Sequence, residues 1–226
     1  MKLLEFFCGT KSVSKVFSKY GYKTFSIDND PQHKPDLCID ILNLEVKNLP
    51  KEWRNPTVIW ASPPCTSFSV MSIPHYWKNG KPKSYKTFIG LALAKKTIEL
   101  IQDLKPKYWF IENPTGMLRK QFFMLNLPRK TITYCQYGFK YRKSTDIWNN
   151  CFNWIPKKPC KNGSNCHQEA RRGMKSGIQG VAVKGLPSMA NWKNNAIERG
   201  ILPPLLIEEI VKACNGDVKI KQNTLK

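Results

Sequence analysis

The stretch "TVIWASPPCTSFS" (57–69) joins an apolar run to a rigid loop that carries one cysteine. "TVIWAS" predicts a buried strand, which must end at Pro63 and Pro64 because proline fixes φ and lacks a backbone donor. Cys65 therefore stands on a stiff loop at the end of a strand. A thiol in this place is either a nucleophile or a small buried hydrophobic side chain.

Similar apolar runs lie on both sides of this stretch. Strands are predicted for "KLLEFF" (2–7), "KTFSIDND" (23–30) and "KYWFIEN" (107–113). Helical spacing is found in "TKSVSKVFSKYGY" (10–22) and "FIGLALAKKTIELIQDL" (88–104). The alternation of strand and helix predicts an α/β fold with a parallel sheet.

The pattern changes after residue 113. "KTITYCQYGF" (130–139) and "TDIWNN" (145–150) predict strands at one edge of the sheet, and "PPLLIEEIVKAC" (203–214) predicts a last helix. Residues 149–195 are rich in Lys, Gly, Asn, Pro and Cys and have little periodicity. We therefore expect a core over 1–148, a small irregular subdomain over 149–195, and a returning helix with a tail over 196–226.

The charge of the chain is strongly positive. Lys and Arg number 37 against 16 Asp and Glu, a formal net charge of +21. This balance favours a polyanionic partner, nucleic acid ahead of an anionic membrane or solubility alone. No apolar run reaches the length of a membrane span, and the start "MKLLEFFCGT" lacks a signal-peptide cleavage region. Eight cysteines without a secretory signal favour a reducing compartment, so we expect a cytoplasmic location. We also expect a monomer.

Candidate ligand-binding residues follow the predicted strands. Four strand ends carry them: "EFFCGT" (5–10), "SIDND" (26–30), "ASPPC" (61–65) and "FIENP" (110–114). Ligands of an open parallel sheet bind beyond the carboxyl ends of its strands. Each signal alone has an ordinary explanation, since Gly9 fits a plain turn and Asp28 a solvated strand end. Together they predict a nucleoside-type cofactor above the turn 7–10, with Asp28 at its ribose hydroxyls.

Glu112 is the clearest partner for Cys65. It ends an apolar strand, and burial there would raise its pKa and provide a proton donor near neutral pH. A thiolate and a protonated carboxyl at one site can attack and protonate an electron-poor ring together. The alternative is an acid that pairs with a nearby lysine.

Four segments in order resemble the cytosine-5 DNA methyltransferases, most of all their short phage and viral members. They are "LEFFCGTKSVSKVF" (4–17), "ASPPCTSFS" (61–69), "FIENPTGML" (110–118) and "CQYGFKYRKSTDIW" (135–148). "RRGMKSGIQG" (171–180) and "ERGILPPLLIEEI" (198–210) are similar to the closing part of those enzymes. The resemblance implies a Rossmann-like methyltransferase fold, with a mixed, mostly parallel sheet, and makes 1–148 the catalytic core.

The resemblance also implies roles for single residues. Cys65 would attack carbon 6 of a cytosine flipped out of double-stranded DNA, and Glu112 would sit at ring N3 and the exocyclic amine. Carbon 5 would then take the methyl group of S-adenosyl-L-methionine. Arg142 or Lys143 would reach the cytosine carbonyl or a phosphate. The cofactor-binding residues would be Phe7, Cys8, Gly9, Thr10, Asp28 for the ribose, Asp40 for the adenine amine, and Pro63.

Two departures from the family keep other functions open. Lys11 and Ser12 stand where the family has further glycines, and Thr145 stands where larger members have a second arginine. The same chemistry on RNA, a cysteine-dependent enzyme of free nucleotides, and a catalytically silent nucleic-acid-binding module are the alternatives. Cysteine after the double proline argues against amino-methylating enzymes, which have Tyr or Phe there.

Two more groups of residues carry predictions. Cys151, Cys160, Cys166 and His167 are candidate ligands of a structural zinc ion, although adjacent ligands at 166 and 167 require a twisted backbone. Reduced thiols and a surface histidine are the alternative. The loop 66–86 mixes aromatic residues with lysines and predicts either a lid that contacts phosphates or a plain surface loop. The predicted nucleic-acid contacts are Ser67, Lys78, Lys81, Lys83, Arg171 and Arg172. The short segment 149–195 predicts a short or loosely read target sequence.

Overall fold

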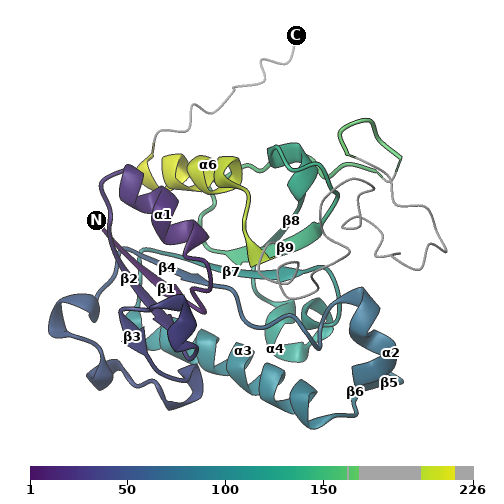
Figure 1. The fold of residues 1–226 in the computed structure, drawn as a ribbon, viewed down its shortest axis with the longest axis horizontal. Helices are drawn as coiled ribbons and strands as arrows, with labels where there is room; N and C mark the ends of the chain where they lie inside the picture. The colour runs from purple at the N-terminus through teal and green to yellow at the C-terminus, as the bar shows by residue number, and fades with distance from the viewer. Residues whose placement is uncertain (162, 168–199, 217–226) are drawn as a thin grey trace.

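A seven-stranded sheet forms the centre of the computed structural model, which describes residues 1–161, 163–167 and 200–216 (Figure 1). Its strands are β1 (Lys2–Phe6), β2 (Lys23–Asp28), β3 (Leu37–Cys38), β4 (Val58–Ala61), β7 (Tyr108–Pro114), β8 (Arg129–Thr133) and β9 (Ser144–Asn149). Their order is β3-β2-β1-β4-β7-β9-β8. The pairs from β3 to β7 are parallel, whereas β9 runs antiparallel to both β7 and β8. The predicted α/β fold with a mixed, mostly parallel sheet is confirmed.

Helices cover both faces of this sheet (Figure 1). One face carries α1 (Ser12–Lys19) and α6 (Pro204–Asn215), which pack with Leu3, Val58 and Trp60 in one buried core. The other face carries α3 (Tyr85–Leu104), which packs with Leu4 and Ile59 in a second core, and the short α4 (Phe122–Leu125). Neighbouring strand residues thus point to opposite cores, as period-two alternation requires. Both faces are covered, which explains why the strands read as continuous apolar runs.

Short helices and a hairpin fill the connections. The 3-10 helices are η1 (Pro31–His33), η2 (Ile41–Asn43), η3 (Val46–Asn48), η4 (Lys51–Trp53), η5 (Val70–Ser72), η6 (Leu118–Lys120) and η7 (Tyr134–Tyr137). The predicted loop 66–86 contains η5, α2 (Ile73–Tyr76) and a hairpin of β5 (Trp77–Lys78) and β6 (Lys81–Pro82). Asn79 and Gly80 form its turn with φ of 49° and 75°, the conformation that an Asn-Gly pair favours.

One predicted strand is shorter than expected. The run 130–139 ends as a strand at Thr133 and continues as η7. Gly138 closes η7 with φ 91°, a value open to glycine, so the chain reverses before β9. The helix predicted at 203–214 is confirmed as α6, whose Asn215 accepts a hydrogen bond from Tyr22 Oη at 2.8 Å. None of the helices in the described ranges combines the length and the apolar composition of a membrane span.

Candidate active site

The predicted site residues follow strand ends that meet at one edge of the sheet. The parallel register pairs Phe6 with both Ile27 and Ala61, and Ala61 with Ile111. The turn after β1, the acid at the end of β2, the loop after β4 and the acid on β7 therefore share that edge. This is where an open parallel sheet binds its ligands.

The turn after β1 has an unusual backbone. Phe7, Gly9 and Lys11 all have positive φ, between 47° and 56°. Two of these residues carry side chains, and left-handed backbone at such residues costs energy and concentrates at functional sites. Asp28 holds the turn, because its Oδ2 accepts a hydrogen bond from Gly9 N at 2.9 Å. A Cβ at Gly9 would meet no atom within 4 Å, so open space lies above this turn.

Two carboxylates stand beside the turn. Asp28 is buried and accepts a second hydrogen bond, from Asp30 N, at 3.0 Å. The backbone carbonyl of Asp28 accepts a hydrogen bond from Ile39 N at 2.9 Å. Because Asp40 follows Ile39 in the chain, this bond brings Asp40 close to Asp28. Asp40 Oδ1 accepts from Leu42 N at 2.9 Å. Each carboxylate keeps lone pairs that can accept a hydrogen bond from a hydroxyl or amine of a ligand, so these two acceptors fit the nucleoside part of the predicted cofactor.

Two buried titratable groups, Glu5 and Cys8, lie on β1 and shortly after it. Burial, with the charges of Asp28 and Glu5, raises the pKa of Cys8 to about 12, so Cys8 is not a second nucleophile. Burial also raises the pKa of Glu5 to about 7, although hydrogen bonds from Ser14 oppose the shift. Glu5 Oε2 accepts from Ser14 N at 3.0 Å and from the Ser14 hydroxyl, and so it caps α1. No pattern in the sequence predicted this role of Glu5.

The loop with Cys65 is fixed to β7 by its backbone. Asn113 Nδ2 donates a buried hydrogen bond of 2.9 Å to Pro63 O. Cys65 is half-buried, and its carbonyl accepts bonds from Phe68 N and Ser69 N at 3.0 and 3.2 Å. Gly116 packs directly on this loop, because a Cβ there would come within 2.0 Å of Phe68 O. The loop is therefore held between β7 and the turn that follows β7.

Glu112 is buried at the same strand end and has two polar neighbours. Tyr134 Oη donates to Glu112 Oε1 at 3.2 Å, and Lys143 Nζ lies 3.9 Å from the same oxygen. Lys143 also donates to Tyr134 Oη at 3.3 Å. Burial and the charge of Glu112 raise the pKa of Tyr134, which keeps its hydroxyl a donor. The sequence prediction missed Tyr134, and its position just before the base-contacting segment was the available signal.

The two basic candidates for catalysis, Arg142 and Lys143, have different neighbours. Lys143 faces Glu112, whereas Arg142 Nε donates to Cys160 O at 3.3 Å. Thr145, where the family's second arginine was expected, is fully buried on β9. The catalytic roles of Arg142 and Lys143 stay predictions.

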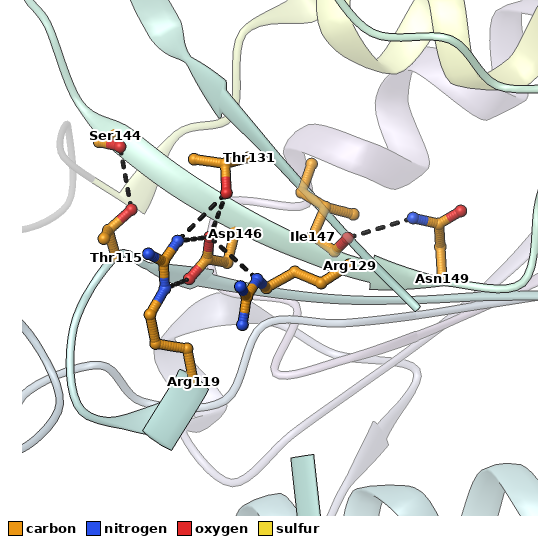
Figure 2. Close-up of polar contacts among 8 residues, drawn as sticks. All are labelled: Thr115, Arg119, Arg129, Thr131, Ser144, Asp146, Ile147 and Asn149. Carbon is orange, nitrogen blue, oxygen red and sulfur yellow. Dashed lines mark hydrogen bonds and ion pairs between the residues drawn. The ribbon is translucent and has the colours of Figure 1, made fainter. Parts of the chain in front are cut away.

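A charged network fixes the chain after β7 to the sheet (Figure 2). Arg119 Nε donates to the buried Asp146 at 2.7 Å, and Arg129 Nε lies 3.7 Å from the same carboxylate. Beside it, the hydroxyls of Thr115 and Ser144 are 2.9 Å apart. These contacts hold the turn that contains Gly116 on β9.

The predicted metal ligands are corrected at one position. Cys160, Cys166 and His167 come together with Cys135, and not with Cys151. Cys151 is fully buried and lies in the same buried core as Cys214 of α6. Cys135 lies in η7, far from the other three in sequence, which is why spacing alone selected the wrong cysteine.

The predicted nucleic-acid contacts divide into three sets. Lys78, Lys81 and Lys83 are exposed on or beside the β5–β6 hairpin. Ser67 is buried, with its carbonyl accepting from Trp77 Nε1 at 2.6 Å, so it does not face solvent. Arg171, Arg172 and the segment 171–180 lie outside the described residues.

Comparison with known proteins identifies the class and the family. The fold is that of S-adenosylmethionine-dependent methyltransferases: Entamoeba histolytica methyltransferase EhMeth superposes with a TM-score of 0.56 at 12% identity, covering 97% of this chain and 99% of that one. A putative DNA modification methyltransferase of an E. coli prophage superposes with a TM-score of 0.50 at 14% identity, covering 72% of this chain and 52% of that one. Residues 1–149 match the family model of the C-5 cytosine-specific DNA methylases, and the chain belongs to this family.

A viral relative agrees with this assignment. The chain is 29% identical over 223 residues to the probable DNA (cytosine-5)-methyltransferase of Frog virus 3 (isolate Goorha). The match covers 95% of this chain and 100% of that protein. The predicted resemblance to short viral enzymes is confirmed, and the chain is a DNA (cytosine-5)-methyltransferase that uses S-adenosyl-L-methionine.

Proposed function

We propose that this enzyme methylates carbon 5 of a cytosine flipped out of duplex DNA, through a covalent adduct with Cys65. The observation that carries the proposal is the buried hydrogen bond from Asn113 to Pro63 O. This bond joins the loop of Cys65 to the end of the strand that carries Glu112. The nucleophile and the carboxyl group can therefore both contact one bound base. The base must leave the stack, because carbon 6 is inaccessible inside a duplex.

The chemistry of the base follows from these groups. The thiolate of Cys65 forms a bond to carbon 6, and the electrons of the 5,6 double bond move toward carbon 5. Glu112 hydrogen-bonds ring N3 and favours this addition, while Tyr134 and Lys143 hold its carboxyl group in place. After methylation a base removes the proton of carbon 5, and the bond from carbon 6 to sulfur breaks. The thiolate and the aromatic ring are restored.

The cofactor residues are proposed from the turn after β1. S-adenosyl-L-methionine supplies an electrophilic methyl group when it is bound. Phe7, Cys8, Gly9 and Thr10 would lie against its methionine part, where the backbone at Gly9 leaves open space. Asp28 would hold the ribose hydroxyls, Asp40 the adenine amine, and Pro63 would close the site from the nucleophile loop.

The hairpin is proposed to contact the DNA backbone. Lys78 and Lys81 are both exposed and stand directly opposite each other in the β5–β6 register. Like charges in this position repel, and a phosphate between them would relieve the repulsion. Such contacts give affinity without reading sequence, in line with the net charge of +21.

The test is transfer of labelled methyl groups from S-adenosyl-L-methionine to duplex DNA, with bulk tRNA in parallel. We expect 5-methylcytosine in DNA from the wild type and from Cys38→Ala, which removes an exposed cysteine of β3. Cys65→Ala should form none. Label on tRNA alone would overturn the substrate and keep the chemistry, and full activity of Cys65→Ala would overturn the mechanism.

A further inference from the structure

Three thiols and one imidazole that the proposed reaction does not use converge beside η7. Cys135, Cys160, Cys166 and His167, here called the Cys3His group, place their ligand atoms within 4.8 Å of one another. Cys135 comes from η7, between β8 and β9, and the others come from the segment after β9. The fold, rather than local sequence, brings them together.

The separations within the group agree with a tetrahedral site. The sulfur atom of Cys135 lies 3.2 Å from that of Cys160 and 3.7 Å from that of Cys166. His167 Nδ1 lies 3.7 and 3.4 Å from the sulfur atoms of Cys160 and Cys166. Zinc–ligand bonds of about 2.3 Å to sulfur and about 2.0 Å to nitrogen give tetrahedral edges of about 3.8 and about 3.6 Å. The group therefore needs only small side-chain movements to enclose one ion.

We propose that Cys135, Cys160, Cys166 and His167 bind a structural zinc ion. Three thiolates and one imidazole in tetrahedral arrangement are a set that zinc prefers. With all four positions taken by protein atoms, the ion has no open position, so its role is structural rather than catalytic.

The surroundings of the group support this assignment. Gln136 Nε2 donates to Cys166 Sγ at 3.2 Å, as neighbouring residues do when they orient metal ligands. Cys160 N donates to Thr133 Oγ1 at 3.1 Å, and Arg142 Nε donates to Cys160 O. The segment 160–167 has few apolar side chains that could pack against η7, so a metal ion would supply the attachment that packing does not.

The ion would connect two functional parts of the chain. η7 begins with Tyr134, which contacts Glu112, and is followed closely by Lys143. The segment 160–167 lies within residues 149–195, the region expected to contact DNA. A zinc ion would fix this part of the region to η7, which begins with the tyrosine that contacts Glu112.

The experiment measures the metal content of the full chain purified without added chelator. We expect one zinc ion per wild-type chain, one in Cys38→Ser and in Cys151→Ser, and a loss of at least tenfold in Cys135→Ser. Retention in Cys151→Ser separates this ligand set from one based on Cys151. Cobalt exchanged into the wild type should give the absorption bands of a tetrahedral site with three sulfur ligands.

A second variant keeps the test informative where Cys135→Ser does not fold. His167→Cys should keep the zinc, and its cobalt form should show the stronger sulfur charge-transfer bands of four thiolates. A wild-type chain without zinc that also binds no cobalt would overturn the proposal. A disulfide between Cys135 and Cys160 found by mass spectrometry of the purified chain would also overturn it.

Discussion

Two buried glutamates, on β1 and β7, show how this sheet uses the same side chain in two ways. Glu5 contacts Ser14, nine residues away, and caps the helix that follows its own strand. Glu112 contacts Tyr134 of η7 and Lys143, which directly precedes β9. Glu5 is enclosed by its own βα unit, whereas Glu112 stands at the strand end that faces the loop of Cys65.

The two glutamates differ in how their surroundings are built. The β1–α1 region closes on itself through local contacts, so its carboxyl group stabilises the turn that the cofactor is proposed to use. The β7–β9 region is built from distant segments that meet around one carboxyl group. Changes at Glu112 should therefore act on the reaction, and changes at Glu5 on the stability of the fold.

The largest effect is expected for Glu112→Gln. The amide keeps the shape of the side chain but cannot give a proton to ring N3, so kcat for methylation should fall about 10³-fold. The Kd for S-adenosyl-L-methionine, measured by calorimetry, should stay within about twofold. Glu99→Gln on the exposed part of α3 is the control. Equal losses in kcat and in cofactor affinity would contradict the assignment of Glu112 to the reaction alone.

Glu5→Gln should change the pH dependence of stability instead. The pKa of Glu5 is raised from 4.5 to about 7 in the folded chain. The protonated side chain therefore adds to the free energy of unfolding fully below pH 4.5, and this addition is lost as pH rises through 7. The wild type should lose on the order of 3 kcal/mol relative to Glu5→Gln between pH 4 and pH 8. Denaturant unfolding at intervals of pH measures this difference, and parallel curves for the two proteins would contradict it.

Gly116→Ala should move the loop of Cys65 without changing Glu112 or Glu5. A methyl group there would displace the backbone at Phe68, and with it the loop of Cys65. A displacement of about 1 Å at a reacting group costs about 10²-fold in rate, so kcat should fall by that factor while cofactor affinity is kept. Gly200→Ala, at a glycine with open space around it, is the matched control. Unchanged methylation by Gly116→Ala would show that the loop position does not matter.

The smallest effect is expected on the hairpin. Lys78→Gln with Lys81→Gln should weaken DNA binding several-fold on every sequence and lower the slope of log K against log salt by about 2. The matched pair is Lys51→Gln with Lys105→Gln, two exposed lysines on other elements. An unchanged salt slope in Lys78→Gln with Lys81→Gln would show that these two lysines do not contact the DNA phosphates.

Much of the fold was predictable because its strands are short apolar runs that end in polar residues. α3 and α6 carry clear helical spacing, and the strand ends at Asp28, Pro63 and Glu112 showed where a site could form. A covered parallel sheet makes these signals strong, since both faces of each strand are buried.

The contacts that complete the site were not predictable from spacing. Asn113 reaches Pro63 across 50 positions of the sequence, and Tyr134 reaches Glu112 across 22. Cys135 joins Cys160 across 25 positions, because the β8–β9 pair returns the chain to η7. Such contacts depend on the order of the strands in the sheet, which cannot be predicted from the spacing of residues in a single sequence.

Covalent catalysis by Cys65 can be tested with duplex DNA that carries 5-fluorocytosine at the target base. Fluorine at carbon 5 cannot leave as a proton would, so the bond between sulfur and carbon 6 should persist after methylation. We predict a complex that survives denaturation, forms only with S-adenosyl-L-methionine, and carries the base on the peptide of Cys65, with none in Cys65→Ala. A complex on another cysteine, or 5-methylcytosine on ordinary DNA without any trapped adduct, would contradict the central role of Cys65.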